Sequence, residues 1–497
     1  MSLGIGARAF AQWLPGIRRN DTIEGVRRLI GLLALSVFLV ATALVGPVAN
    51  AAAPIWTLQD AAVARQLAVP PAAMANPSSP TGQPEWLAQD EAYRGYLDSK
   101  LALANNKAKV SAKLTKIVRA GKLGAASSIR VIDVATGQVV YDRKPGKART
   151  VASNTKILTA ITALERLGTQ RTFQTTIRRS GKSATVYFVS GGDPRMTNTK
   201  LKSLARQTAT AMKQKTGGAP KKVTVRLDDT IFSGPAKHKT WRKGGYNLAT
   251  IQPIRGTARV EVRSADSAKS AATVFTKYLG KALGKATKAE YKGKRKAPKS
   301  ASVTGSVQSE TTEALVRRML TNSDNQVAEV LHRHVALAAG YKGTFAGGVK
   351  ATAKTLRKLG VSLAGLSQVD GSGLSPRNRM TTAFLTRTLR AAANPDELPL
   401  RTILYTANSL PLAGRTGTLW SGYGRFSSSE SKCAAGLIVA KTGTLDYEIA
   451  LSGYTVGGDG RLKAFSILVN GVKGAKRTAA RKAMDAAAAA VSGGCTR

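Results

Sequence analysis

Three short polar motifs occur in a fixed order along this chain of 497 residues. They are Ser153-Asn154-Thr155-Lys156, Ser323-Asp324-Asn325 and Lys441-Thr442-Gly443. If they act together, the fold must bring a hydroxyl, two amines and an amide to one place from three distant segments. The motifs therefore constrain the fold more than any other feature of the sequence.

Each motif alone is weak evidence, because a lysine-rich chain produces copies by chance. Residues 429–432 repeat the serine-lysine spacing of the first motif, Lys215-Thr216-Gly217 repeats the third, and Arg415-Thr416-Gly417 imitates it. The Ser-x-Asn pattern occurs only at Ser323. Chain order then excludes Lys215, which precedes Ser323, and Ser429, which follows it.

The sequence after the first motif predicts a helix. Lys156 opens an apolar run over residues 157–164, so Ser153 would lie at the helix start and Lys156 one turn along the same face. A serine in this position is by default an ordinary N-cap. The second motif, taken alone, is likewise a polar turn before a helix over residues 326–334.

The sequence around the third motif predicts a strand. Lys441 follows the short apolar stretch 436–440, which is typical of a buried strand, although a lysine there is by default a solvated strand end. Lys215 precedes Gly217-Gly218-Ala219-Pro220, which predicts a loop. The flanking sequence therefore favours Lys441 over its copy.

The chemistry explains the residue types. A serine hydroxyl is a poor nucleophile until a base takes its proton, and a lysine can do so only if burial and nearby positive charge keep its amine neutral. Lys156 is placed to be this base for Ser153. Lys441 would supply the second positive charge, which lowers the pKa of Lys156 and attracts a substrate carboxylate.

The remaining motif residues suit supporting roles. Ser323 could relay a proton to the leaving amine, and Asn325 could hold the substrate amide or the lysine. Thr442, Gly443 and Thr444 would form the substrate-binding edge of the strand. The pattern also implies that the backbone N–H groups of Ser153 and Thr444 receive the oxyanion.

The motifs and several further segments resemble one known family, the D-alanyl-D-alanine carboxypeptidases/endopeptidases that form low-molecular-mass class C of the penicillin-binding proteins. The likeness runs loosely from about residue 123 to about residue 491. The segments are 152–156, 191–194 (Gly-Gly-Asp-Pro), 323–325, 370–375 (Asp-Gly-Ser-Gly-Leu-Ser), 410–414 (Leu-Pro-Leu-Ala-Gly) and 440–445. Segments 370–375 and 410–414 point to this class rather than to the β-lactamases.

The resemblance implies an α/β fold of the penicillin-binding/serine β-lactamase-like transpeptidase type, in which an antiparallel sheet with helices faces a helical cluster. It also implies one domain inserted between the first two motifs. The expected division is a catalytic domain over residues 85–170 and 299–497, interrupted by an inserted domain over residues 171–298. Arg415 to Leu419 matches a Gly-Thr-Leu loop of the family and is expected to be structural.

The N-terminal region predicts export. Residues 1–28 form a basic segment that would stay in the cytoplasm, the run 29–48 is apolar, and small residues follow to residue 53. This layout is typical of a signal peptide, but the run is also long enough for an uncleaved membrane anchor. Either alternative places the enzyme outside the cytoplasm, secreted to the cell-wall side or anchored to the plasma membrane. Residues 54–84 read as a linker.

Two local predictions complete the pass along the chain. Residues 85–107 look helical, and residues 127–133 with 138–141 alternate like a hairpin around Gly137. Cys433 and Cys495 are the only cysteines, and in an oxidising compartment they would form a disulfide. Sequence alone does not place them within bonding distance.

The charge limits the partners. Seventy-six Lys and Arg against 28 Asp and Glu give a formal net charge of +48, which is large enough to influence long-range association. Lysines 277, 281, 285, 288 and 292 recur at helical spacing, and they form either a solvated helix face or a surface for anionic wall polymers or lipid head groups. Nucleic acid is not expected, because export separates the chain from it and no recognition motif occurs.

Competing functions are weaker. The three histidines, His238, His332 and His334, form no metal-binding motif, so no metal or other cofactor is expected, and Gly371-Ser372-Gly373 lacks the pattern of a Ser-His-Asp hydrolase. The sequence thus predicts a serine D-Ala-D-Ala carboxypeptidase, with endopeptidase action also open. It would act on peptidoglycan stem peptides and be inhibited by β-lactam antibiotics. A catalytically silent wall-binding protein and a β-lactamase remain the alternatives.

Overall fold

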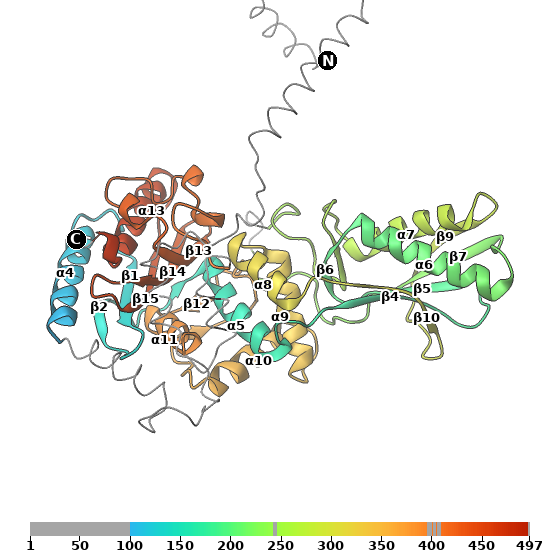
Figure 1. The fold of residues 1–497 in the computed structure, drawn as a ribbon, viewed down its shortest axis with the longest axis horizontal. Helices are drawn as coiled ribbons and strands as arrows, with labels where there is room; N and C mark the ends of the chain where they lie inside the picture. The colour runs from blue at the N-terminus through green and yellow to red at the C-terminus, as the bar shows by residue number, and fades with distance from the viewer. Residues whose placement is uncertain (1–99, 242–245, 395–399, 401–403, 405–408, 496–497) are drawn as a thin grey trace, which may run out of the picture. The chain divides into compact units, whose positions relative to one another are not determined.

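The computed structural model describes residues 100–241, 246–394, 400, 404 and 409–495 (Figure 1). A five-stranded antiparallel sheet has the strand order β13-β14-β15-β1-β2. Its strands are β1 (Ser127–Asp133), β2 (Val139–Arg143), β13 (Ile438–Thr444), β14 (Glu448–Val456) and β15 (Leu462–Asn470). Because β1 pairs with β15, residues that precede the first motif and residues that follow the third share one sheet.

The sheet is buried on both faces because its strands alternate apolar side chains. In β15, Phe465 and Ile467 pack on one side, whereas Ala464 and Leu468 pack on the other, as the two-residue period of a strand requires. The first side is covered by α4 (Lys100–Arg119) and α13 (Gly474–Ala489).

A helical cluster covers the second side (Figure 1). Its helices are α5 (Thr155–Leu167), α8 (Thr312–Thr321), α9 (Asn325–Ala338), α10 (Phe345–Lys358) and α11 (Thr382–Ala392). A small three-stranded sheet consists of β3 (Arg149–Thr150), β11 (Leu366–Ser367) and β12 (Arg379–Met380). Strand β3 precedes α5 in the chain, and β11 and β12 lie between α10 and α11. The first two motifs therefore begin helices of this cluster, and the third lies on the sheet that it covers.

Two local predictions can be compared with these elements. The hairpin around Gly137 is confirmed, since β1 and β2 pair antiparallel and Gly137 takes a φ of 75°, which suits glycine. Of the helix predicted over residues 85–107, the described part from Lys100 is helical, and α4 ends later than predicted, at Arg119, because Val110 and Leu114 are buried against the sheet. Residues 85–99 lie outside the described residues, as do the basic segment, the apolar run and the linker.

A second five-stranded sheet forms between the first two motifs, in the order β10-β4-β5-β7-β9. Its elements are β4 (Gln174–Arg179), β5 (Thr185–Val189), β7 (Lys222–Asp228), β9 (Lys288–Lys294) and β10 (Ser302–Gln308), with helices α6 (Asn198–Thr216) and α7 (Ser267–Leu283) packed on it. Strands β5, β7 and β9 are parallel, with α6 and α7 in the connections. The division of the chain at residues 171 and 298 stays a prediction, and β10 joins this sheet from beyond residue 298.

The helical spacing of the five lysines proved wrong for its second half. Helix α7 ends at Leu283, and Lys288 and Lys292 belong to strand β9. In β9 the two-residue period decides which side chains are exposed, because Ala289 and Tyr291 pack toward the core of this sheet.

The long connection from β7 to α7 returns to the helical cluster. It contains β8 (Thr257–Arg259), which pairs in parallel with β6 (Asp193–Met196). Before β8, Trp241, Ile251 and Ile254 pack with Val330 of α9 and Phe345 of α10. The connection therefore reaches α10 and α9, the helix that begins at the second motif.

Candidate active site

The first motif forms a short 3-10 turn (Ala152–Asn154) that leads directly into α5. Ser153 is partly exposed, whereas Lys156 is completely buried. The Lys156 Nζ atom lies 2.9 Å from Ser153 Oγ, 2.7 Å from Asn325 Oδ1 and 2.7 Å from the Ser372 carbonyl oxygen. The buried amine thus contacts three oxygen atoms, one of which belongs to the accessible hydroxyl of Ser153.

Burial makes this amine easier to deprotonate. It lowers the pKa of Lys156 to about 8, although the negative charges of Glu329, Asp370 and Asp324 act in the opposite direction. A lysine with this pKa is partly neutral near physiological pH, and the neutral form is the one that can accept a proton from the serine.

The second motif positions one of the three oxygen atoms. Asp324 caps α9 by accepting a hydrogen bond from the N–H of Val327, and Asn325 is the first residue of the helix. While Asn325 Oδ1 accepts from Lys156, its Nδ2 donates to the Thr250 carbonyl at 3.3 Å. The orientation of the amide is therefore set from both ends. Ser323 lies in the turn before α9 and has a φ of 57°.

The third motif lies on β13, beside the 3-10 turn that carries Ser153. Lys441 is completely buried, and its Nζ donates to the Thr442 carbonyl at 3.0 Å. Burial, then the charges of Lys156 and Arg425, hold the pKa of Lys441 well below its usual range. The two lysines therefore influence each other electrostatically, with no hydrogen bond between their amines in the described structure. Thr442 and Gly443 are buried, and Thr444 is exposed at the end of the strand.

The close approach of strand and turn depends on glycine. A Cβ atom at Gly443 would lie 2.7 Å from the Val151 carbonyl and 3.1 Å from the Cβ of Ala152. Gly373, with a φ of 84°, lies against the other side of the turn, where a Cβ would come within 1.9 Å of the Ala152 carbonyl. The turn that carries Ser153 is thus packed between two backbones.

The structure adds groups that no sequence motif predicts. Ser372 supplies a carbonyl to Lys156, Thr250 supplies one to Asn325, and the Thr418 hydroxyl lies 2.7 Å from that of Thr442. Glu329 is completely buried one helical turn after Asn325. Only the i, i+4 spacing of Asn325 and Glu329 was a usable signal in the sequence, because the other contacts depend on tertiary packing.

The copies of the motifs lie elsewhere. Lys215 belongs to the last turn of α6, and Gly217 ends the helix in the left-handed conformation, so the loop predicted at residues 217–220 follows directly after it. Ser429 is exposed in the segment before Cys433. The loop after Arg415 is the exception, since its Thr418 reaches the third motif.

Two of the three histidines, His332 and His334, contact backbone carbonyls rather than the motif residues. Nε2 of His332 lies 3.0 Å from the Phe345 carbonyl, and Nε2 of His334 lies 3.0 Å from the Gly192 carbonyl. Burial lowers the pKa of each to about 4. Both are therefore neutral at physiological pH.

A disulfide joins Cys433 to Cys495, with Cα atoms 5.4 Å apart. It links the segment before β13 to the short 3-10 turn that follows α13 (Gly493–Cys495). Both residues lie on the side of the sheet opposite the helical cluster.

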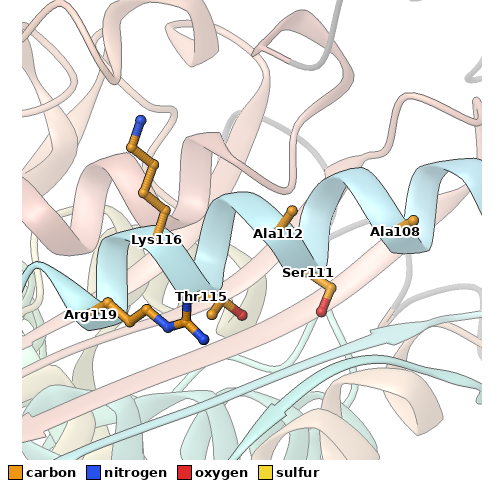
Figure 2. Close-up of a pocket in the computed structure, with 6 residues that line it drawn as sticks. All are labelled: Ala108, Ser111, Ala112, Thr115, Lys116 and Arg119. Carbon is orange, nitrogen blue, oxygen red and sulfur yellow. The ribbon is translucent and has the colours of Figure 1, made fainter.

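A surface hollow on α4 is separate from this constellation (Figure 2). Figure 2 shows its lining on one face of the helix: Ala108, Ser111, Ala112, Thr115, Lys116 and Arg119. It contains none of the motif residues.

Comparison with known proteins identifies the family. The sequence matches the D-Ala-D-Ala carboxypeptidase 3 (S13) family over residues 110–261 and 254–491. The chain belongs to this family. It is therefore a D-alanyl-D-alanine carboxypeptidase by family, and the predicted resemblance is confirmed.

Individual S13 relatives agree with this assignment. A carboxypeptidase of Mycobacterium tuberculosis is 31% identical over 394 residues, which cover 76% of this chain and 82% of the relative. Carboxypeptidase DacB of Mycolicibacterium smegmatis is 30% identical over 70% of this chain and 77% of the relative. The D-alanyl-D-alanine carboxypeptidase of Actinomadura is 25% identical over 71% of this chain and 79% of its own.

A solved structure confirms the predicted fold class. Penicillin-binding protein 4 of Haemophilus influenzae superposes with a TM-score of 0.63 at 20% identity, and the match covers 75% of this chain and 98% of that protein. The S13 chain thus has the mixed α/β, penicillin-binding/β-lactamase-like fold. Within the described residues, none of the helices is long and apolar enough to cross a membrane.

Proposed function

We propose that this S13 protein is a serine-type D-alanyl-D-alanine carboxypeptidase that acts through an acyl-Ser153 intermediate. The observation that carries the proposal is the 2.9 Å contact between the buried Lys156 amine and the accessible Ser153 hydroxyl. A neutral lysine at this distance can accept the proton of the serine as its oxygen attacks a carbonyl carbon.

The reaction proceeds in two steps. Ser153 Oγ attacks the carbonyl carbon of the penultimate D-Ala, and its proton passes to Lys156. The C–N bond to the terminal D-Ala then breaks, and the leaving amine takes a proton through the Ser323 hydroxyl. Water hydrolyses the resulting ester and restores Ser153. The N–H groups of Ser153 and Thr444 receive the oxyanion, and Lys441 attracts the terminal carboxylate of the substrate.

The substrate class is the peptide stem of peptidoglycan, and β-lactams bind as inhibitors. The names of the S13 relatives support the D-Ala-D-Ala part of this proposal. The Haemophilus penicillin-binding protein 4 has also been solved in complex with a β-lactam, which supports β-lactam binding here. Cleavage of cross-links, an endopeptidase action of the same site, requires only that a longer amine leaves.

The site of action is extracytoplasmic in this proposal, on the cell-wall side and either secreted or anchored. Its support is the apolar run 29–48 behind a basic segment. The proposed catalytic residues would then meet peptidoglycan in the cell wall. The basic surface formed by lysines 277, 281, 285, 288 and 292 would lie near anionic wall polymers or lipid head groups.

Two other functions are less well supported. A silent wall-binding protein would not need a buried lysine beside an accessible serine. A β-lactamase needs a group that activates water rapidly. Glu329 is a carboxylate close to Lys156, but it is completely buried and its oxygens accept hydrogen bonds from the backbone of Gly371 and Ser372. It is therefore poorly placed to activate water, which disfavours the β-lactamase.

The test is covalent labelling by a fluorescent penicillin, followed by a denaturing gel. We expect stable labelling of the purified protein, no labelling of Ser153→Ala, and normal labelling of Ser429→Ala, which serves as the control for the copied motif. An unlabelled wild-type protein would contradict the acyl-serine proposal and favour the silent protein. Rapid loss of the label would favour the β-lactamase.

A further inference from the structure

The backbone of Gly371 and Ser372 is held from two sides. On one side, the Thr159 hydroxyl of α5 donates to the Gly371 carbonyl at 2.7 Å. On the other side, Glu329 of α9 accepts from the Gly371 N–H at 3.1 and 3.2 Å and from the Ser372 N–H at 2.8 Å. This short segment is therefore fixed between the helix of the first motif and the helix of the second.

The same segment touches the base of the proposed reaction. The Ser372 carbonyl oxygen accepts a hydrogen bond from Lys156 Nζ at 2.7 Å and so orients the amine. The N–H of the same residue donates to Glu329. Asn325, one turn before Glu329 on α9, provides another such atom. Helix α9 thus controls two of the three partners of Lys156, one directly and one through Glu329.

The segment leaves little room for adjustment. A Cβ atom at Gly371 would lie 2.5 Å from the Cβ of His332 and 3.0 Å from the Ala328 carbonyl, both on α9. Asp370, the preceding residue, accepts from the N–H groups of Gly373 and Ser375. If the Glu329 contacts were lost, the N–H groups of Gly371 and Ser372 would lose their acceptor on α9, and the position of the Ser372 carbonyl would be held less firmly.

We propose that Glu329 is a positioning residue for Lys156: its carboxylate fixes the Gly371–Ser372 backbone that orients the amine, and, when ionised, it supplies a buried negative charge that acts on that amine. The proposal rests on the proposed function, because it assumes that Lys156 is the base for Ser153. Glu329 makes no contact with substrate in it and acts only through Lys156.

Two opposing influences act on the ionisation of Glu329. Both carboxyl oxygens accept hydrogen bonds from backbone N–H groups, which suits the ionised form. Burial, with the nearby charge of Asp370, opposes ionisation and raises the pKa of Glu329 to about 8. Since burial lowers the pKa of Lys156 to about 8, the two groups titrate in the same range and form a coupled pair.

The other charged groups around the pair come from several elements. Asp370 faces both members, and Asp324 at the start of α9 faces Lys156. Arg333 on α9 interacts with Glu329, and Lys441 on β13 interacts with Lys156. None of them hydrogen-bonds the Glu329 carboxylate within the described residues, so the ionised form of Glu329 acts on Lys156, Arg333 and Asp370 only through space.

The test compares Glu329→Gln with the wild type by the rate of penicillin acylation as a function of pH. Loss of the negative charge removes an influence that raises the pKa of Lys156, so the acidic limb of the profile should move to lower pH, by about one pH unit. The plateau rate should fall about 10- to 100-fold, because the amine is held less accurately. An unchanged limb would overturn the electrostatic part of the proposal, and an unchanged plateau the positioning part.

Two further variants separate charge from position. Glu329→Asp keeps the charge but shortens the side chain, and Thr159→Val removes only the hydroxyl that holds the same segment from α5. Both should lower the plateau and leave the acidic limb where it is. A limb shift in Thr159→Val would contradict the assignment of the shift to Glu329. If Glu329→Gln does not fold, an undiminished plateau in both of these variants refutes the positioning role.

A matched control is Glu313→Gln on α8, where the carboxylate pairs with Arg317 at 2.7 Å on the same helix. It loses the same charge and should keep the wild-type profile. Failure of the proposed function would look different, since the wild type itself would not be acylated at Ser153.

Discussion

Two residues in the candidate site have backbone conformations that residues other than glycine rarely adopt. Ala152 has a φ of 47° and Ser323 a φ of 57°, and they precede Ser153 and Asn325 by one and two residues. Such conformations cost about 1–3 kcal/mol each and persist where the surroundings determine them. At Ala152 the surroundings are the close backbones of Gly373 and Gly443. Strain is thus concentrated next to Ser153 and Asn325.

At the scale of single residues, the ionisation of Lys156 should set the pH dependence of acylation. Burial lowers its pKa to about 8, and only the neutral amine accepts the serine proton. The acylation rate should therefore rise as pH increases through about 8 and level off above it. Stopped-flow acylation by a chromogenic β-lactam between pH 6 and 10 measures this profile.

The Lys156→Ala variant completes this prediction. It should lose acylation at every pH, whereas exposed Ser429 can be changed to alanine with no effect on the profile. A Lys156→Ala variant with full activity would show that another group is the base.

The residues of this site that could be predicted from the sequence are those that lie in a local sequence motif. Ser153 and Lys156 are one helical turn apart, and Asn325 opens a helix, so each lies in a recognisable local pattern. The Ser372 carbonyl, Thr250 carbonyl and Thr418 hydroxyl leave none, because their roles come from loops that fold against distant elements. Backbone atoms in particular carry no residue-type signal.

At the scale of elements, the site depends on the contact between strand β13 and the 3-10 turn that carries Ser153. In Gly443→Ala, the new Cβ would lie 2.7 Å from the Val151 carbonyl and 3.1 Å from the Cβ of Ala450. The strand and the turn must then separate by a few tenths of an ångström. We expect acylation to slow by about 10- to 100-fold through misalignment, measured with the same fluorescent penicillin.

Gly146→Ala is the control for this strand prediction, because a Cβ there meets no atom within 4 Å and the residue is not in the left-handed region. It should acylate like the wild type. Equal rates in both variants would mean that Gly443 is not needed for the close approach.

The elements also show where prediction from sequence failed. The five lysines fit one helical period, but the helix ends at Leu283, where Gly284 follows with a φ of 114°. Lysines that recur every few positions do not distinguish a helix from a strand, because their side chains are exposed to solvent in both. Apolar positions were better guides, as in β13 and α5, because burial forces their period.

At the scale of the whole molecule, the net charge of +48 is the feature that the catalytic residues do not explain. Lys277, Lys281 and Lys285 are exposed on or just after α7. Exposed lysines on one helix face can attract an anionic surface, each by about 1 kcal/mol, and the attraction is screened by salt. The location of these charges then matters as well as their number.

We expect the triple variant Lys277→Gln, Lys281→Gln and Lys285→Gln to bind anionic phospholipid vesicles more weakly than the wild type in sedimentation at about 0.1 M salt. The control replaces Lys107, Lys109 and Lys116 of α4, which are equally exposed, and therefore loses the same three charges from a different surface. If α7 faces the anionic surface, the first variant should lose more binding than the second. Equal losses would show that net charge alone governs the attraction, because position would then have no effect. Penicillin labelling of both variants should stay at the wild-type level, since none of the six lysines belongs to the three motifs.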